Sequence, residues 1–455
     1  MKQVKIAFIG AGSVCFCPAT VVDILRNESF GQVDVEIFLM DIREEPMQLS
    51  KNFCEKIAAR LGKKPRIKAS TDLREAVSGA DFVITAIEVE RYHYWSQDFL
   101  IPRRYGFRQV YGENGGPGSM FHTLRNLPPL LEIARMMEKE CPGAWLLNYT
   151  NPEAKLVEGI SRLSKIKVVG LCHGEGMGHE QLGSLLQMPN ERIGYRSVGL
   201  NHFGWFTKIW DKETNEDLYP KLKEAELKAD PLAHWDEIAL SRIMLRTYGL
   251  WPYPGANHIG EYIAWSDGFL ASAMAQFTHD PVVDKLWKSP ENPLPHIYSF
   301  SAGNPTDRPL FGKNDDNWKE SFNPDGELHG SGEYGIPIAE AIFFDKPTEI
   351  GTVNVPNKGY AKDLPEGMVI ELPALVDGKG IHPHQTDPLP TAIAQMISAQ
   401  GAIHKLVIDA YEEQSRNKLL QAVLLDPTVS NYHNAVAMIN EMCELQKDIL
   451  PVLHW

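Results

Sequence analysis

The chain has 455 residues, of which 43% are hydrophobic and 23% charged, with 36 Gly and 31 Pro. This composition is that of a globular enzyme and excludes a disordered, collagen-like or coiled-coil chain. The 59 acidic side chains outnumber the 45 Lys and Arg, and the formal net charge of -14 disfavours binding to nucleic acid or to an anionic membrane. We therefore expect a small molecule as the partner.

No stretch of the chain approaches the roughly 20 apolar residues of a membrane-spanning helix. The apolar run at residues 5–10 leads into a glycine turn and not into a signal-peptide cleavage site. The six cysteines form no CxxC pair and no disulfide-dense pattern. These features predict a cytoplasmic protein with free thiols.

Short β-branched runs alternate with helical patterns over the first 172 residues. Between residues 49 and 61, apolar side chains recur at four-residue intervals, as in a helix packed on a sheet. Because parallel strands need crossover connections that are usually helical, the alternation predicts a doubly wound parallel sheet of Rossmann type. The six expected strands are residues 5–9, 33–40, 66–69, 82–86, 145–149 and 167–172.

Beyond residue 172 this alternation is lost. Helical patterns there are mixed with residues 352–383, where strand patterns are interrupted by Pro and Gly. The sequence therefore predicts two domains: a nucleotide-binding, Rossmann-like α/β domain over residues 1–172 and an α+β domain over residues 173–455. The expected helices of the second domain are residues 221–229, 235–248, 391–413, 419–424 and 432–443.

A glycine turn follows the first expected strand, at Gly10-Ala11-Gly12-Ser13. Glycines at this place let backbone N–H groups approach a pyrophosphate at a helix N-terminus. Cys15 stands where the usual fingerprint has its third glycine, and an ordinary tight turn has the same first two. Asp41 ends the second strand, where a carboxylate can accept hydrogen bonds from both adenosine ribose hydroxyls, and an acid there favours NAD over NADP.

Cys172 and His173 end the sixth expected strand, at the sheet edge where doubly wound folds bind ligands. His202 follows later in the chain, within the motif GLNHFGW. A thiolate and an imidazole can both bind a divalent metal, with substrate and water filling the other positions. A buried cysteine and a core histidine fit the same pattern, so spacing alone leaves the choice open.

Two polar loops belong to the same expected edge of the sheet. Asn151 precedes a proline, which holds it extended so that its amide can reach a hydroxylated ligand. The glycine-rich loop at residues 112–118 can bring Glu113 close to a ligand without obstructing it. Ordinary surface turns have similar sequences.

Taken in order, these motifs resemble those of the NAD-dependent, metal-dependent glycoside hydrolases of family 4. The resemblance covers most of the chain and keeps the family's order. Its segments are KIAFIGAGS, DLREAVSGADFVITAI, GENGGPGSMFHTLRNLP, LLNYTNPE, LCHG, GLNHFGW and NVPNKGYAKDLPEGMVIELPALVDGKGIHP. This family is an exception to two-carboxylate glycosidase chemistry.

The resemblance implies a reaction in which NAD takes hydride from C3 of the sugar and later returns it. The C3 ketone makes the C2 proton acidic, and a base removes that proton while the metal stabilises the enediolate. The C1 leaving group is then expelled and water adds, so each turnover is redox-neutral. On this resemblance the first domain binds NAD, and the second is the catalytic domain that binds substrate and metal.

The resemblance also implies roles for single residues. Cys172 and His202 are the expected metal ligands, with Mn²⁺ as the expected ion. Glu113 and Asn151 are expected to hold sugar hydroxyls, and His173 is expected to be the general acid. The residues expected to bind NAD are Gly10, Gly12, Ser13, Asp41, Thr85 and Glu88.

The general base is expected in the motif at residues 255–262. The α-glucosidase-like relatives have an Asp where this chain has Ala256, so that acid is not available here. Other branches use a tyrosine near the position of Tyr262, and we expect Tyr262 to be the base, with the substrate-binding His258 as second candidate. A phenol needs metal or cationic help to lose its proton at neutral pH, and an aromatic side chain half-buried beside Trp265 fits equally well.

The residues after Cys172 indicate the substrate class. Phospho-sugar branches carry Asp or Asn there, whereas His173 resembles the enzymes for unphosphorylated sugars. Gly174 resembles the α-glucuronidase branch and leaves space for a C5 carboxylate, but Glu175 would repel a uronate if it faced the pocket. We expect an α-glucuronidase; the alternatives within the family are an α-galacturonidase, an α-glucosidase and an α-galactosidase.

Two interpretations from other classes explain part of the pattern. An NAD-dependent 2-hydroxy acid dehydrogenase would have the same first domain, but would accumulate NADH and need no metal. A nucleotide-binding redox sensor would use Cys172 as a regulatory thiol. Because members of the resembled family are usually dimers or tetramers, we expect a homodimer or homotetramer whose only other partner is a glycoside.

Overall fold

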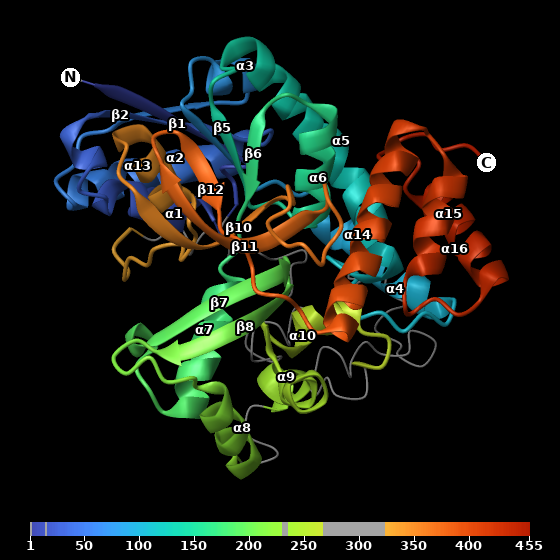
Figure 1. The fold of residues 1–455 in the computed structure, drawn as a ribbon. Helices are drawn as coiled ribbons and strands as arrows, with labels where there is room; N and C mark the ends of the chain where they lie inside the picture. Colours follow the sequence, from blue (N-terminus) through green and yellow to red (C-terminus); the bar gives the residue numbers. More distant parts are fainter. Residues whose placement is uncertain (1, 14–15, 230–234, 267–323) are drawn as a thin grey trace.

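The computed structural model describes residues 2–13, 16–229, 235–266 and 324–455. Its strands are β1 (Gln3–Ile9), β2 (Asp34–Met40), β3 (Arg66–Ser70), β4 (Phe82–Thr85), β5 (Trp145–Asn148), β6 (Lys167–Gly170), β7 (Ile193–Leu200), β8 (Phe203–Asp211), β9 (Trp251–Tyr253), β10 (Thr348–Pro356), β11 (Val369–Asp377) and β12 (Gly380–Pro383). In the described part of the chain they form one sheet in the order β3-β2-β1-β4-β5-β6-β10-β11-β7-β8-β9, with β12 on β11 (Figure 1).

The first six strands are parallel and have the order of a dinucleotide-binding fold, β3-β2-β1-β4-β5-β6. Each lies within two residues of its predicted range. The predicted Rossmann-type sheet is therefore confirmed.

Helices cover both faces of this sheet because both faces of its strands are apolar. In β1, Val4, Ile6 and Phe8 belong to one core, whereas Ala7 and Ile9 belong to the other. The first core includes α1 (Cys17–Arg26), α2 (Glu44–Arg60) and α13 (Gly335–Phe344), and the second includes α3 (Leu73–Val77), α5 (Gly116–Glu140) and α6 (Glu153–Leu163). The predicted apolar stripe of residues 49–61 lies on α2.

The second half of the chain extends the same sheet. β10 pairs antiparallel with β6, so the backbone groups at the edge of β6 are hydrogen-bonded. β11 pairs with β10 and β7, and the antiparallel strands β8 and β9 follow. The predicted boundary at residue 172 falls just beyond β6, inside this continuous sheet, and the division into two domains stays a prediction.

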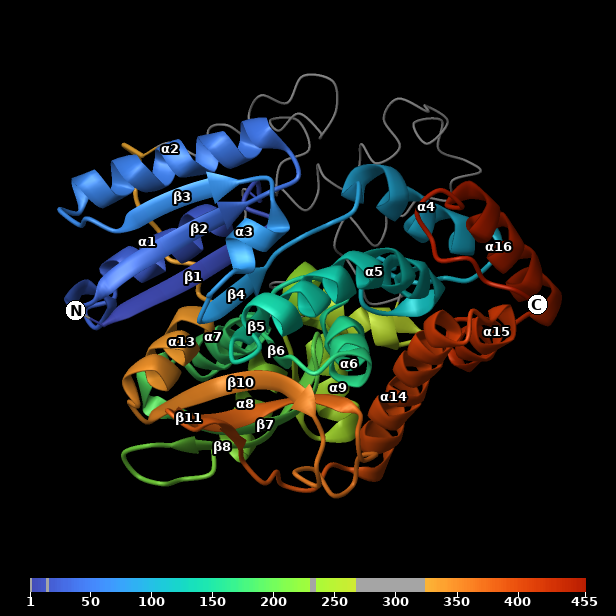
Figure 2. The same ribbon diagram turned by 90° about the horizontal axis from the view of Figure 1, so that it is seen from above.

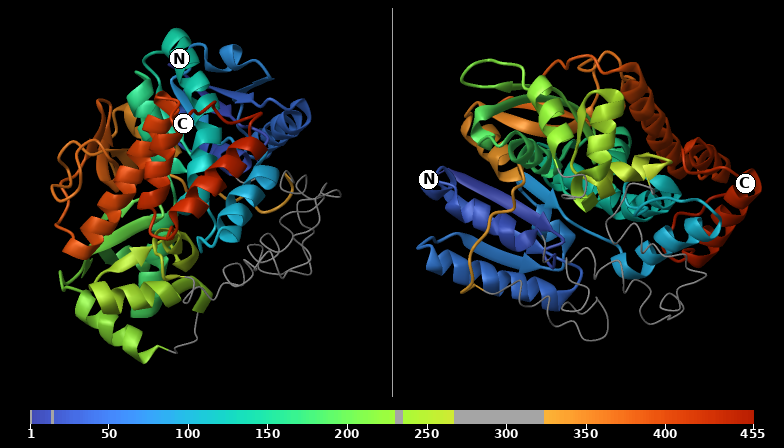
Figure 3. Two further views of the ribbon diagram at one scale, coloured as in Figure 1. Left: turned by 90° about the vertical axis from the view of Figure 1, so that its right-hand side faces the viewer. Right: turned by 90° about the horizontal axis from the view of Figure 1, so that it is seen from below.

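The C-terminal helices pack at the end of the molecule away from the N-terminus. α14 (Thr391–Glu412), α15 (Arg416–Leu425) and α16 (Tyr432–Leu445) correspond to predicted helices and form a core with α5 and α4 (Arg91–Arg104), as Figures 2 and 3 show. The described part of the chain has no helix that is both long and apolar enough to cross a membrane. The other helices among the described residues are α7 (Gly174–Leu186), α8 (Tyr219–Lys228), α9 (Trp235–Tyr248), α10 (Ala256–Ile259) and the 3₁₀ turns η1 (Phe30–Gln32), η2 (Asn190–Arg192) and η3 (Gly260–Tyr262).

Candidate active site

The glycine turn packs tightly against the ends of its neighbours. Gly10 has φ +90, and a Cβ atom there would lie 2.2 Å from the carbonyl oxygen of Ala86. The N–H of Gly12 donates to Oδ2 of Asp41 at 2.8 Å, and a Cβ on Gly12 would lie 2.8 Å from the same oxygen. Both glycines are therefore needed for this close approach, and the Asp41 carboxylate lies at the turn, as the sequence predicts.

Ser13 connects the turn to α1. Its N–H donates to the carbonyl of Gly10 at 2.9 Å, and its hydroxyl oxygen accepts from the N–H of Phe16 at 3.3 Å. α1 begins at Cys17, four residues after Ser13, and a helix N-terminus favours a pyrophosphate. Cys15, the residue at the third fingerprint position, lies outside the described residues.

Thr85 and Glu88, both expected to bind NAD, make contacts within the protein. Thr85 is fully buried and donates its hydroxyl to Oδ1 of Asn148 at 3.0 Å. Glu88 lies 2.9 Å from Nε2 of His122 and accepts from Nδ2 of Asn126 at 3.1 Å, which ties it to α5. The Thr85 hydroxyl thus contacts the Asn148 side chain, and the NAD-binding role of Thr85 and Glu88 stays a prediction.

A row of paired residues crosses four strands beneath the expected metal site. Gly170 of β6 pairs with Asn354 of β10, Asn354 with Glu371 of β11, and Glu371 with Gly199 of β7. The last residues of β6 and β7 therefore lie in the same row across the sheet, and the segments that follow them begin close to this row. One of them carries Cys172 and the other His202.

The Cys172 thiol meets the turn that carries His202 through Asn201. The Asn201 side chain hydrogen-bonds the thiol and donates to Oε2 of Glu371 at 3.3 Å. Cys172 also accepts from the N–H of Gly174 at 3.4 Å. Burial, reinforced by the charge of nearby carboxylates, raises the pKa of the Cys172 thiol well above its ordinary value. A divalent cation stabilises a thiolate, so ion binding would oppose this shift.

His202 occupies the two-residue turn of the β7–β8 hairpin, directly before Phe203. Its φ of +63 is in the left-handed region, which is rare for a histidine and concentrates at functional sites. Its Nδ1 lies 3.0 Å from Nδ2 of Asn114. Burial lowers the pKa of His202 well below its ordinary value, so the imidazole is neutral, the form that binds metals.

His202, His258 and Glu261 offer ligand atoms that all lie within 4.8 Å of one another, among the residues described. The two imidazole rings have centroids 4.3 Å apart. Nδ1 of His258 and Oε2 of Glu261 are buried, and no hydrogen-bond partner for them is found in the described part of the chain. Buried polar atoms of this kind are costly unless a ligand satisfies them, so the donor set fits a divalent cation or a polar substrate. His202 thus has two neighbours that offer ligand atoms, whereas the Cys172 thiol is not part of this group.

Glu261 was not predicted from the sequence. Its other carboxylate oxygen accepts the N–H groups of Glu113 and Asn114 at 2.7 and 3.0 Å and so holds the glycine-rich loop. The spacing of three residues from His258, which places both side chains on one side of a helical turn, is the signal that could have identified it.

Tyr262, the expected general base, is buried and already hydrogen-bonded. Its ring stacks on Phe203, and its hydroxyl donates to the carbonyl of Asn201 at 3.0 Å. The side chain is 4% exposed, and burial together with the charge of Glu261 raises its pKa well above the ordinary value. A general base must face its proton and ionise near the working pH. His258 meets these requirements better. Burial lowers its pKa, so the imidazole is neutral and can accept a proton, and its Nδ1 has no hydrogen-bond partner among the described residues.

The other expected substrate contacts lie near this cluster. Glu113 is buried, and its backbone carbonyl lies 3.1 Å from Nδ1 of His122. The backbone carbonyl of Asn151 accepts from Nδ2 of Asn126 at 3.0 Å, and the bond between Asn151 and Pro152 is cis. Both residues are held by α5, which begins at Gly116, within the glycine-rich segment 112–118.

His173 makes a short contact with a distant residue. Its Nδ1 lies 2.6 Å from Oε1 of Glu333, and this hydrogen bond raises the pKa of His173 above its ordinary value. Its side chain is about half exposed. The imidazole is thus accessible to a ligand beside the Cys172 thiol.

Comparison with known proteins identifies the family. The model of the family 4 glycosyl hydrolases matches residues 5–188, and that of the family's C-terminal domain matches residues 197–429. The chain is 31% identical over 470 residues to an alpha-glucosidase of Erwinia rhapontici, covering 95% of each protein. It is 29% identical over 456 residues to an alpha-galactosidase of Bacillus subtilis, covering 98% of this chain and 99% of that protein. The chain therefore belongs to family 4 of the glycosyl hydrolases.

A solved structure shows the same fold. The 6-phospho-alpha-glucosidase from gut microorganisms in complex with NAD and Mn²⁺ has a TM-score of 0.77 at 23% identity, with 100% of both chains covered. Family membership confirms the resemblance and the assignment as a glycosidase. The dehydrogenase and the redox-sensor interpretations are thereby set aside.

Proposed function

We propose that this chain hydrolyses α-glycosides of unphosphorylated sugars, and α-glucuronides in particular, with NAD and Mn²⁺ as cofactors. One observation carries the proposal: the glycine turn with Asp41 and the cluster around His202 both follow strands of one sheet. A dinucleotide site and a cation site that open at the same sheet edge can act on one sugar.

The residues present fit both cofactors. Gly10, Gly12 and Asp41 suit a dinucleotide, and we assign Cys172 and His202 to the ion, with the unsatisfied atoms of the neighbouring cluster beside it. When bound, NAD supplies a reversible hydride acceptor, and the metal supplies positive charge for the oxygens at C2 and C3. We assign the sugar hydroxyls to Glu113 and Asn151.

The acid and base are assigned from their surroundings. We propose His258 as the base that takes the C2 proton, because its imidazole is neutral and has an unsatisfied nitrogen beside His202. Tyr262 becomes the second candidate. His173 holds the proton for the leaving-group oxygen, since it is accessible and lies next to Cys172. These groups suffice for elimination and readdition at C1 and C2.

The surroundings of Glu175 support the choice of a uronate. This carboxyl is 1% exposed, accepts from the hydroxyl of Tyr334 at 2.9 Å and hydrogen-bonds Tyr195. Burial raises its pKa above the ordinary value, which favours the neutral form. Glu175 is therefore enclosed by tyrosine hydroxyls and is not an exposed group at the surface of a pocket.

Gly174 leaves space between the Cys172 thiol and Pro254. A Cβ atom at this position would lie 3.5 Å from Sγ of Cys172 and 3.2 Å from the ring of Pro254. A larger residue would therefore fill the space between thiol and proline. This agrees with a substrate that needs room beside the metal site.

A panel of nitrophenyl α-glycosides tests the substrate class. Glucuronide, galacturonide, glucoside and galactoside would be compared with NAD, Mn²⁺ and a reductant present. We expect the highest kcat/KM for the glucuronide. Hydrolysis of the glucoside without hydrolysis of the glucuronide would overturn the choice.

We further propose a cytoplasmic homodimer or homotetramer. Cys17, Cys54, Cys141, Cys172 and Cys443 are free thiols, in keeping with a reducing compartment. Of the exposed large apolar side chains described, Leu424, Leu425, Tyr432, Leu445, Val452 and Trp455 lie in the last helices and the C-terminus, where a second copy could cover them. Light scattering after size-exclusion chromatography tests this, and a monomer at micromolar concentration would contradict it.

A further inference from the structure

A buried carboxylate from a distant part of the chain contacts the proposed general acid. Oε1 of Glu333 lies 2.6 Å from Nδ1 of His173. The glutamate side chain is 2% exposed, whereas the imidazole is 50% exposed. This contact occupies Nδ1 and leaves Nε2, on the other side of the ring, for a ligand.

The position of Glu333 is set by α1. Both the N–H and the hydroxyl of Ser331 donate to Oδ2 of Asp23, at 2.9 and 2.5 Å. The N–H of Glu333 then donates to the hydroxyl oxygen of Ser331 at 3.1 Å. Between them Gly332 has φ +73, and a Cβ there would lie 3.9 Å from Cβ of His173. The segment 331–333 is therefore held between the nucleotide-binding helix and the histidine.

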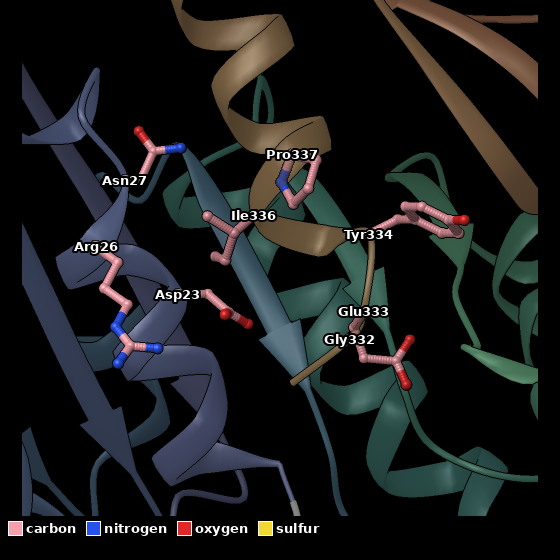
Figure 4. A pocket seen from close by; sticks show the side chains of 8 residues that line it. All are labelled: Asp23, Arg26, Asn27, Gly332, Glu333, Tyr334, Ile336 and Pro337. Atoms are coloured by element: carbon pink, nitrogen blue, oxygen red, sulfur yellow. The ribbon is translucent and has the colours of Figure 1, made fainter. Parts of the chain in front are cut away.

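A pocket borders this segment. A pocket of about 420 Å³ separates the end of α1 from the start of α13, and both Asp23 and Glu333 line it. Figure 4 shows the Glu333 carboxylate turned away from Asp23 and α1. Its Oε1 contacts His173, which agrees with a role at the active site.

We propose that Glu333 is a positioning residue that holds the His173 ring through Nδ1, so that Nε2 faces the leaving-group oxygen and delivers the proton to it. The inference rests on the proposed function. As the C1–O bond breaks, its electron pair passes to the leaving oxygen, and the proton leaves Nε2 for the same oxygen. Glu333 forms no bond to the substrate and is not consumed. Solvent returns the proton to Nε2 before the next turnover.

If Glu333 acts through the general acid, the loss of kcat in Glu333→Gln should depend on the leaving group. A purely structural role would lower kcat equally for all leaving groups. Nitrophenolate leaves without protonation, phenolate benefits from it and methoxide requires it. With NAD and Mn²⁺ saturating, Glu333→Gln should change kcat on the nitrophenyl α-glucuronide by less than about threefold. On the methyl α-glucuronide we expect a loss of about 100-fold, with the phenyl glycoside between them.

Matched variants complete the test. Glu327→Gln makes the same change in the same segment at a side chain that is 84% exposed, and should behave as wild type. Glu333→Asp should restore part of the methyl glycoside activity. In a His173→Ala background, Glu333→Gln should have no further effect, because the residue acts only through the imidazole.

The outcomes separate the inference from the proposed function. If wild-type protein hydrolyses none of the three glycosides with both cofactors, the proposed function fails. If wild type is active and Glu333→Gln loses the same factor on all three, or loses nothing, the positioning role is refuted and the function stands. Circular dichroism and NAD binding, measured on each variant, show whether a uniform loss comes from misfolding, which would assign Glu333 a structural role instead.

Discussion

Nδ2 of Asn114 lies 3.0 Å from Nδ1 of His202, so the imidazole is oriented by an amide from the glycine-rich loop. The amide is itself fixed, because its oxygen accepts from the N–H of Glu153 at 3.3 Å and its backbone N–H donates to Glu261. Partners of this kind decide which ring nitrogen faces a metal.

Replacing Asn114 should weaken ion binding. Asn114→Ala frees the His202 ring to rotate, and we expect Mn²⁺ affinity to fall about 10- to 100-fold. Titration followed by electron paramagnetic resonance of free Mn²⁺ measures this without activity. Asn52→Ala, on the exposed side of α2, is the control. Equal affinity of Asn114→Ala and wild type would show that the contact does not orient a ligand.

The glycine turn is sensitive to one methyl group. In Gly12→Ala the new Cβ would lie 2.8 Å from Oδ2 of Asp41 and 2.7 Å from Cβ of Pro46. We expect NAD affinity to fall at least about tenfold, because overpacking of this kind costs ~1–3 kcal/mol. Fluorescence titration with NADH measures it. Gly143→Ala, where a Cβ meets nothing within 4 Å, should leave affinity unchanged. A similar loss in both variants would contradict the assignment.

The two candidate bases can be separated by isotope exchange. At saturating Mn²⁺, His258→Asn should lower kcat by about 10²- to 10⁴-fold and slow exchange of the C2 proton with solvent. Tyr262→Phe removes only a buried hydrogen bond to Asn201, and we expect less than a tenfold change in kcat with a lower Tm. Exchange at C2 that survives in His258→Asn and disappears in Tyr262→Phe would restore the tyrosine as base.

The buried carboxyl of Glu158, which lies outside the candidate site, should make the stability of the protein depend on pH. Burial raises the pKa of this α6 carboxyl to about 7. The folded protein therefore keeps a proton that the unfolded chain loses near pH 4.5, and stability decreases as the pH rises from about 4.5 to 7. The full effect is on the order of 1–3 kcal/mol.

Glu158→Gln should remove this contribution. Relative to wild type, the variant should gain a few degrees in Tm at pH 8 and little at pH 5. Scanning calorimetry at both values checks it. Glu55→Gln, at an exposed α2 carboxylate, serves as control. A Tm difference from wild type that does not change with pH would refute the prediction.

The parallel strands could be predicted because their pattern is local, whereas the hairpin that carries His202 could not. Its glycines pack against aromatic rings: a Cβ on Gly194 would lie 2.3 Å from Trp210, and one on Gly204 would lie 2.0 Å from Tyr253. Glycine weakens a strand pattern, and only the folded structure shows what the missing side chain makes room for.

Helix α5 was missed for a similar reason. It contains Pro128 and Pro129, and nearly all of its first half is buried, so it has no polar face to mark the helical period. At the site, Cys172 and His202 were identified from motifs. Glu261 and Glu333 were not, because their roles depend on backbone N–H groups and an imidazole far away in the sequence.

Release of sugar in D₂O tests the central claim most directly, since transient oxidation requires the C2 proton to leave and return. With an α-glucuronide, NAD and Mn²⁺, we predict one deuterium at C2 of each product molecule by NMR, with no net rise in NADH absorbance. Sugar released with its original C2 hydrogen, or NADH that rises in step with product, would contradict the account.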